Sequence, residues 1–141
     1  MYRYNVEITK VVDGDTVDVD VDLGFGMVYK KQRVRLMGID TPESRTRDLE
    51  EKFYGKESKK YLESMLKDMK IELVSHDKGK FGRILGELFI EGDYEKSINQ
   101  LLIDNFHAVP YYGDSKDLTE IHHMKNRVQL NSQGIIYEVK D

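Results

Sequence analysis

Three consecutive stretches at the start of the chain have the pattern of β-strands, and they restrict the possible folds more than any other feature. Apolar side chains occupy every second position from 2 to 8 and from 17 to 21, and a third candidate strand extends from about 27 to 39. A period of two is typical of strands that bury one face. Glycines within 13–15 and 24–26 mark the turns between them. We therefore predict three successive strands, the third ending at Thr41-Pro42, because proline stops ladder pairing.

Helical and strand signals alternate in the remainder of the chain. Helices are predicted at about 56–67, 94–105 and 115–130, and further strands at 71–74 and 84–90. The expected apolar face of the last helix consists of Leu118, Ile121, Met124 and Val128. A closed antiparallel sheet is the simplest way to leave no bare strand edge. The pattern predicts an α+β fold with a five-stranded OB-type β-barrel and three α-helices.

The composition supports one ordinary domain over residues 1–141. The chain contains no cysteine, which excludes disulfides, thiolate chemistry and cysteine zinc sites. No apolar run has the roughly 20 residues that span a bilayer, and residues 1–10 lack the apolar core of a signal peptide. We expect a cytoplasmic protein with no membrane partner; a secreted mature form is the alternative.

The charge balance argues against strong non-specific binding to nucleic acid. The formal net charge is −4, whereas proteins that hold DNA by bulk electrostatics are usually basic. The exception is the segment 76–83, where Lys78, Lys80 and Arg83 face only one acidic residue, Asp77. A local positive loop of this kind could guide a phosphate backbone.

Arg35 lies in the predicted third strand, between the apolar residues Val34 and Leu36. A guanidinium there needs an anionic partner, because burying it unpaired costs several kcal/mol. Two interpretations stay open. Arg35 forms a structural ion pair with Asp40 or Glu43, or it binds a phosphate, for which its planar fork is well shaped.

Two other segments carry candidate site residues. Asp13 and Asp15 flank a turn, and paired carboxylates can supply oxygen ligands to a hard cation, although Asp-Gly turns are also common in hairpins. Arg83 follows the glycine-bearing loop 77–82 and could reach a phosphate near Arg35; the alternative is an ordinary solvated hairpin.

Taken together and in order, these segments resemble the staphylococcal nuclease-like (thermonuclease) family. The strongest matches are VVDGDT at 11–16, RVRLMGIDTPE at 33–43, YGKE at 54–57 and DKGKFGR at 77–83, with weaker matches at 98–102, 108–111 and 134–137. Such a resemblance implies an OB-type barrel that carries a calcium-dependent nuclease site, with magnesium as the alternative ion.

The resemblance also implies a role for each matching residue. The metal would be bound by the carboxylates of Asp15 and Asp40 and by the backbone carbonyl of Thr41. Asp13 would support these ligands without touching the metal. Glu43 would act as general base or position the water, while Arg35 and Arg83 would bind the scissile phosphate. The implied nucleotide contacts are Lys80, Phe81 and Tyr111.

The implied function is a monomeric endonuclease that hydrolyses DNA or RNA and leaves 3′-phosphate ends. The alternative is a non-catalytic OB-fold module that binds nucleic acid or a peptide, because fold alone does not fix function. Phe81 and Gly113 stand where the family often has tyrosines, and the chain is acidic, so substrate affinity and preference are open.

Other charged or titratable groups on the helices receive no site role from the sequence. His122 and His123 are adjacent, so they diverge by about 100° on a helix and do not both bind one ion. We expect Lys56, Lys59 and Lys60 to form a solvated face that Glu57 and Glu63 offset.

Overall fold

The computed structural model describes residues 2–78 and 82–139, and its core is a closed five-stranded barrel. The barrel strands are β1 (Tyr2–Asp13), β2 (Thr16–Gly24), β3 (Met27–Leu36), β5 (Ile71–Lys78) and β6 (Ile84–Ile90). They follow the order β1-β2-β3-β6-β5, and β5 pairs back with β1. All pairs are antiparallel except β3–β6, which is parallel. The predicted α+β barrel is confirmed.

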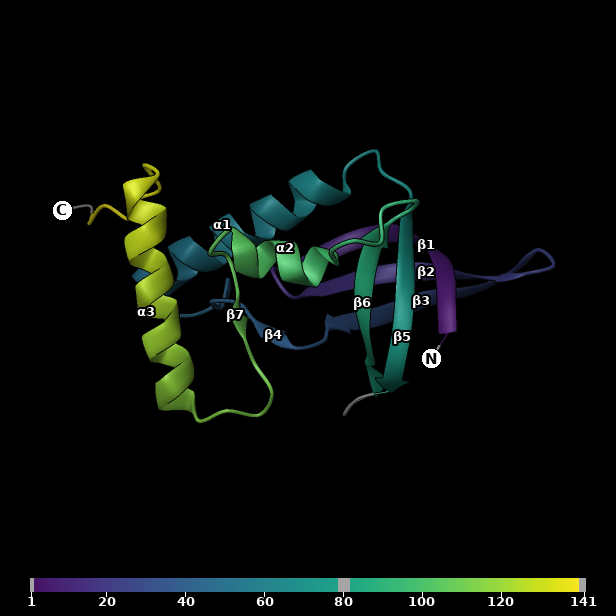
Figure 1. The fold of residues 1–141 in the computed structure, drawn as a ribbon, viewed down its shortest axis with the longest axis horizontal. Helices are drawn as coiled ribbons and strands as arrows, with labels where there is room; N and C mark the ends of the chain where they lie inside the picture. Colours follow the sequence, from purple (N-terminus) through teal and green to yellow (C-terminus); the bar gives the residue numbers. More distant parts are fainter. Residues whose placement is uncertain (1, 79–81, 140–141) are drawn as a thin grey trace.

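The helices gather at one end of this barrel (Figure 1). They are α1 (Leu49–Leu66), α2 (Ile98–Asp104) and α3 (Lys116–Ser132). Helices α1 and α2 pack directly on the barrel, whereas a two-stranded sheet of β4 (Ile39–Asp40) and β7 (Val109–Pro110) lies between α3 and the barrel. The β2–β3 hairpin projects from the opposite side. Among the described residues, no helix combines the length and the apolar character that crossing a bilayer requires.

The predicted alternation fills the barrel interior. Val17, Val19 and Val21 of β2 are almost fully buried, while the aspartates between them face outward. They pack against Val34 and Leu36 of β3 and against buried residues of β5, β6, α1 and α2. Removal of this apolar surface from water is the main stabilising contribution to such a fold.

Several predicted boundaries were wrong. The strand predicted at 71–74 continues to Lys78, and the helix predicted at 94–105 begins at Ile98. Two further differences concern the third strand and the first helix. The third strand ends at Leu36 and not at Ile39, because Gly38 takes a positive φ of 79° and turns the chain into the separate strand β4. Helix α1 begins at Leu49 and not near Lys56, because the Asp48 carboxylate caps the backbone N–H groups of Glu50 and Glu51. Both differences lie beside the site described below.

The expected apolar face of the last helix was also wrong. Leu118, Ile121, Met124 and Val128 are all exposed, by 43% to 66%. The buried residues of α3 are Thr119, His123 and Leu130. The helix thus packs with a mainly polar face, in which His123 contacts Asp40 and Asn126 donates to the carbonyl of Ala108.

A single buried amide joins α2 to the barrel. Asn99 donates from Nδ2 to the carbonyls of Met37, at 2.9 Å, and Gly86, at 3.2 Å, and its Oδ1 accepts from the backbone N–H of Leu88 at 3.2 Å. The Gly86 carbonyl also accepts from the backbone N–H of Met37 at 2.9 Å, and a buried backbone group that lost its last partner would cost about 1–3 kcal/mol. Asn99 therefore fixes the turn that follows β3.

His107 gives the folded state a dependence on pH. It is buried and stacked on Tyr61, with ring centroids 4.5 Å apart, and its Nδ1 has no partner among the described residues. Burial lowers the pKa of the His107 imidazole, although the charge of Glu57 acts in the opposite direction. The unfolded chain then holds this proton more tightly than the folded chain. The contribution of neutral His107 is complete above the unfolded pKa and is lost as the pH falls below it.

We therefore expect His107→Phe, which keeps a ring against Tyr61 but cannot bind a proton, to lose less stability on acidification than the wild type does. Each unit of pKa difference corresponds to about 1.4 kcal/mol. Urea unfolding at pH 7.5 and pH 5 measures the effect, and His122→Phe, at a partly exposed position, is the control. Equal acid sensitivity of His107→Phe and wild type would show that other groups cause the loss.

Candidate functional site

An open cleft of about 550 Å³ lies where the β1–β2 turn, the end of β3, the segment 40–45 and the start of β6 meet. The residues that line it are Asp13, Asp15, Thr16, Arg35, Asp40, Thr41, Pro42, Glu43, Ser44, Arg45 and Arg83. All the residues for which the sequence predicted a catalytic, metal-binding or supporting role are among them. The fold thus brings together segments that are far apart in the chain.

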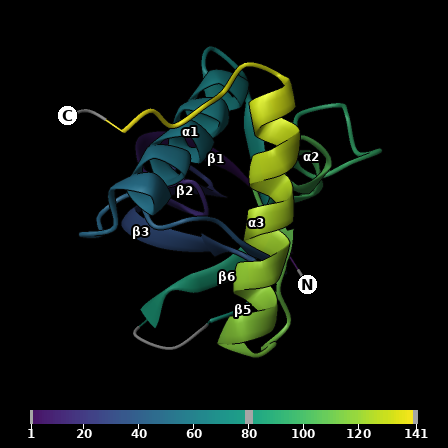
Figure 2. The same cartoon turned by 90° about the vertical axis from the view of Figure 1, so that its left-hand side faces the viewer.

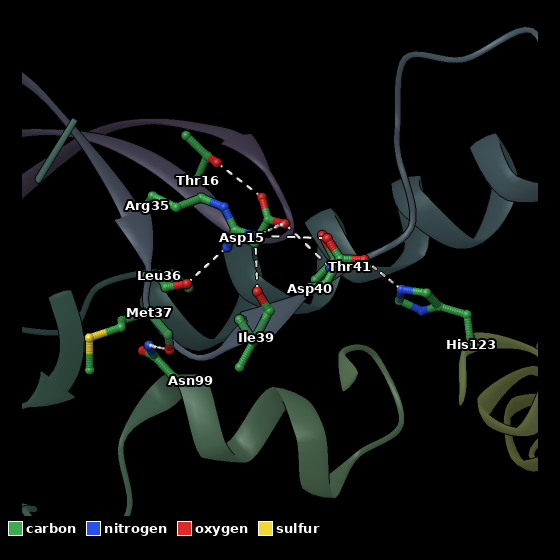
Figure 3. A network of polar contacts seen from close by, with 10 residues as sticks. All are labelled: Asp15, Thr16, Arg35, Leu36, Met37, Ile39, Asp40, Thr41, Asn99 and His123. Carbon is green, nitrogen blue, oxygen red and sulfur yellow. Dashed lines mark hydrogen bonds and ion pairs between the residues drawn. The ribbon is translucent and has the colours of Figure 1, made fainter. Parts of the chain in front are cut away.

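Arg35 is held at the centre of this cleft by its own strand end (Figure 3). Its Nη1 donates to the carbonyl of Leu36 at 2.8 Å, and its Nη2 donates to the carbonyl of Ile39 at 2.9 Å. The turn at Gly38 brings both carbonyls to one side of the guanidinium. These bonds fix the plane of the guanidinium, so the side chain is oriented before any ligand arrives.

The two predicted metal-binding carboxylates converge on the same nitrogen atom. Arg35 Nη2 lies 3.4 Å from Asp15 Oδ2 and 3.8 Å from Asp40 Oδ1. Asp15 is further held by the Thr16 hydroxyl, at 3.0 Å, and by the backbone N–H of Thr41, at 3.3 Å. The ion pair of Arg35 with Asp40, one of the two considered from the sequence, is therefore present, and Asp15 is a further partner. No ion pair between Arg35 and Glu43 occurs in the described chain.

Asp40 has a partner that the sequence did not identify. His123 Nε2 lies 2.7 Å from Asp40 Oδ2, and the His123 side chain is only 9% exposed (Figure 3). Thr119 and Asn126 lie on the same side of α3, and Asn126 donates to the carbonyl of Ala108 at 3.0 Å. The spacing of these polar residues at three and four positions was the available signal. The apolar positions of this helix form a clearer pattern, and they were predicted to be the buried face in place of the polar ones.

Glu43 and Arg83 present unused polar groups. Glu43 is exposed at the cleft and forms no hydrogen bond or ion pair within the described residues. Arg83 Nε is buried and has no hydrogen-bond partner in the same part of the chain. A buried donor without a partner is costly unless a ligand satisfies it. A carboxylate and a guanidinium are thus both available to a molecule in the cleft.

The remaining predicted residues differ in their placement. Asp13 accepts a short hydrogen bond from the Ser44 hydroxyl and pairs with Arg45 at 3.6 Å, so it holds the segment that follows Glu43. Tyr111 follows β7 and is 36% exposed, but it does not line the cleft. Lys80 and Phe81 lie outside the described residues.

The position of Glu43 depends on a glycine in the middle of α1. A Cβ atom on Gly55 would lie 2.5 Å from the carbonyl carbon and oxygen of Glu43. Only glycine allows this approach of helix and loop. On the same helix, burial raises the pKa of the Glu51 carboxyl, and the charge of Glu43 acts in the same direction. Helix α1 therefore sets both the position and the electrostatic surroundings of Glu43.

The donor atoms of the cleft fit a hard cation. Carboxylates and backbone carbonyls are the ligands that calcium and magnesium prefer, and both ions also retain water. Within residues 2–78 and 82–139, no group of three or more His, Asp or Glu side chains is placed to hold a metal ion. A cation here would use Asp15, Asp40 and the Thr41 carbonyl, with water in its other positions.

Comparison with known proteins gives a consistent result. Residues 33–135 match the model of the family described as "Staphylococcal nuclease homologue". A thermonuclease of Staphylococcus hyicus is 31% identical over 86 residues, which cover 60% of this chain and 47% of that protein. Endonuclease YncB of Bacillus subtilis is 30% identical over 105 residues, which cover 70% and 44%. An uncharacterized protein of Methanocaldococcus jannaschii is 28% identical over 154 aligned positions, which cover 94% and 72%. The chain spans less than half the length of the first two relatives.

Proposed function

The chain belongs to the staphylococcal nuclease homologue family, and on that premise we propose that it is a metal-dependent endonuclease that hydrolyses phosphodiester bonds of DNA or RNA. One observation carries the proposal: Arg35, Arg83, Glu43 and the Asp15–Asp40 pair line a single cleft. The thermonuclease and the endonuclease among its relatives support it at the level of the family.

The two arginines would bind and stabilise the reacting phosphate. A phosphodiester gains negative charge on its equatorial oxygens as a fifth oxygen approaches, and fixed donors that match this charge lower the barrier. Arg35 is already oriented by two carbonyls, and Arg83 has a free Nε in the described structure. Little reorganisation would therefore be needed when the substrate binds.

Glu43 would orient and deprotonate the attacking water. A general base must be ionised and within reach of the proton that it accepts. The Glu43 carboxylate is exposed to the cleft and is not engaged by any hydrogen bond or ion pair in the described residues. Its backbone is fixed against Gly55, which limits movement of this carboxylate away from the phosphate.

We propose calcium as the ion and Asp15, Asp40 and the Thr41 carbonyl as its protein ligands. When bound, such an ion supplies Lewis-acid chemistry at a phosphoryl oxygen. His123 would hold the second oxygen of Asp40 and so orient that ligand. One chain supplies every residue of the cleft, which supports action as a monomer.

Incubation of the protein with single-stranded DNA, duplex DNA and RNA tests the proposal. We expect cleavage with calcium or magnesium and no cleavage in EGTA or EDTA. A circular single-stranded substrate tests endonuclease action. To test for 3′-phosphate ends, strands with a phosphatase-resistant 5′ label would be cleaved and then treated with phosphatase. A change in the mobility of the labelled products indicates that a 3′-phosphate was removed. Failure to cut any of the three substrates with either ion would overturn the proposed activity.

A further inference from the structure

A second, smaller hollow adjoins the cleft. Its volume is about 190 Å³, and it is lined by Lys10, Val12, Ser44, Arg45, Lys56 and Lys59. Ser44 and Arg45 line the cleft as well, so the two hollows meet at these residues. We call this second hollow the basic hollow. Its position next to Glu43 and Arg45 places it where a bound chain leaving the cleft could continue.

All four ionisable side chains that line the basic hollow are cationic, although the whole chain has a net charge of −4. Arg45 is paired with Asp13 at 3.6 Å, and its side chain is still 74% exposed. Lys10, Lys56 and Lys59 form no ion pair within the described residues. Asp18 attracts Lys10 electrostatically, but no acidic side chain lines the hollow itself, so its positive charge favours an anionic ligand.

The fold gathers these lysines from two elements. Lys56 and Lys59 are one turn apart on α1 and share a face. Lys60 pairs with Glu57 at 3.5 Å and does not line the hollow. Lys10 comes from β1, and the buried residues Val12 and Ser44 complete the lining. The lysines that the sequence placed on one solvated face are therefore divided, and two of them point to the hollow.

We propose that the basic hollow is a second phosphate-binding subsite, which holds a phosphate of a polynucleotide whose scissile phosphate lies in the adjoining cleft. This inference rests on the proposed function and adds to it, because it distinguishes polynucleotides from short substrates. A polynucleotide carries regularly spaced anions, so a chain in the cleft would present its next phosphates to Arg45 and then to Lys56 and Lys59. Small substrates would not reach them.

Affinity for long strands should then depend on Lys56 and Lys59 through counterion release. Each neutralised phosphate of a single strand contributes about 0.7 to the slope of log affinity against log salt. The basic hollow holds one phosphate, so loss of both lysines should make the slope shallower by about 0.7. At 0.1 M salt, one decade below a 1 M reference, this corresponds to roughly 5-fold weaker binding.

Binding measured without cleavage tests this subsite. Fluorescence anisotropy of labelled dT16 and dT3 would be recorded in EDTA over a range of salt concentrations, with the whole chain. The test variant is K56Q with K59Q, and the matched control is K60Q with K70Q, which removes the same charge outside the hollow. We expect weaker binding and a shallower slope for dT16 only in the test variant, and little change for dT3.

The outcomes separate the subsite from the nuclease proposal. Equal salt slopes for dT16 in the test variant and the wild type, in protein that cleaves DNA, would overturn the subsite and leave the activity intact. An equal effect of the control pair would also overturn it, since the binding would then depend on overall charge. The expected slope change in a protein that cuts nothing would overturn the nuclease proposal and leave a nucleic-acid-binding subsite.

Discussion

Arg35→Ala and Arg83→Ala are each expected to lower the rate of phosphodiester cleavage by roughly 10²–10³-fold, the effect of removing one donor that stabilises a developing oxyanion. Both guanidiniums line the cleft, and Arg35 is held within it by two backbone carbonyls. Single-turnover cleavage of labelled single-stranded DNA measures the change.

Stability must be measured beside activity for these variants. Loss of Arg35 also leaves the carbonyls of Leu36 and Ile39 without their donor, which would destabilise the end of β3. Arg33→Ala is the matched control on the same strand, because Arg33 pairs with Asp18 on the outer surface at 2.9 Å. Thermal unfolding followed by circular dichroism shows which variants remain folded. Near-normal cleavage by a folded double variant of Arg35 and Arg83 would remove both arginines from the mechanism.

Glu43→Gln is expected to lower the cleavage rate by about 10²–10⁴-fold, the range for loss of a general base. The substitution keeps the size of the side chain and removes only its charge and basicity. Glu43 has no hydrogen bond or ion pair in the described residues, so stability should change little. The measurement is the pH dependence of single-turnover cleavage.

A matched substitution distinguishes the base from a general effect of charge. Glu50→Gln, at the start of α1, removes one charge from a residue that pairs with Arg127 and does not line the cleft. We expect its cleavage rate to remain near that of the wild type. If Glu43→Gln cleaved within a few-fold of the wild-type rate with an unchanged pH profile, another group would have to activate the water.

The barrel was predictable because its signal is local and repeated. Val17, Val19 and Val21 alternate with aspartates, and a strand places such residues on opposite faces. The third strand was predicted too long because Ile39 continues the apolar pattern after Gly38, and a pattern of hydrophobicity does not report a positive φ. Strand boundaries are decided by such backbone geometry as much as by side-chain character.

The cleft was predictable in its residues but not in its contacts. Arg35 and Asp15 were candidates from their residue types and positions, and the resemblance to the nuclease family gave Asp40 a metal-binding role. The structure brings both carboxylates to one guanidinium nitrogen of Arg35. Their roles in catalysis and metal binding remain predictions. His123 was missed because the contact with Asp40 joins positions 83 residues apart. Only tertiary packing brings such residues together.

The contacts of Lys56, Lys59 and Lys60 were likewise not predictable from the sequence of their helix. Their sequence suggested one solvated face, since all three lie within one turn of helix. The structure pairs Lys60 with Glu57 and directs Lys56 and Lys59 to a hollow that β1 completes. The contribution of Lys10 from a distant strand could not be read from the helix itself.

The polar packing of α3 means that different residues of the cleft are held by elements of different stability. Arg35 and Asp15 belong to the barrel, whereas one oxygen of Asp40 is held by a helix that buries only Thr119, His123 and Leu130. We expect a helix with so little buried apolar surface to open at a lower free energy than the barrel. Detachment would release one carboxylate oxygen and leave Asp15 and the guanidinium in place. The barrel would then stay folded while the residues of the cleft lost their alignment, so a folded barrel is not sufficient for an assembled site.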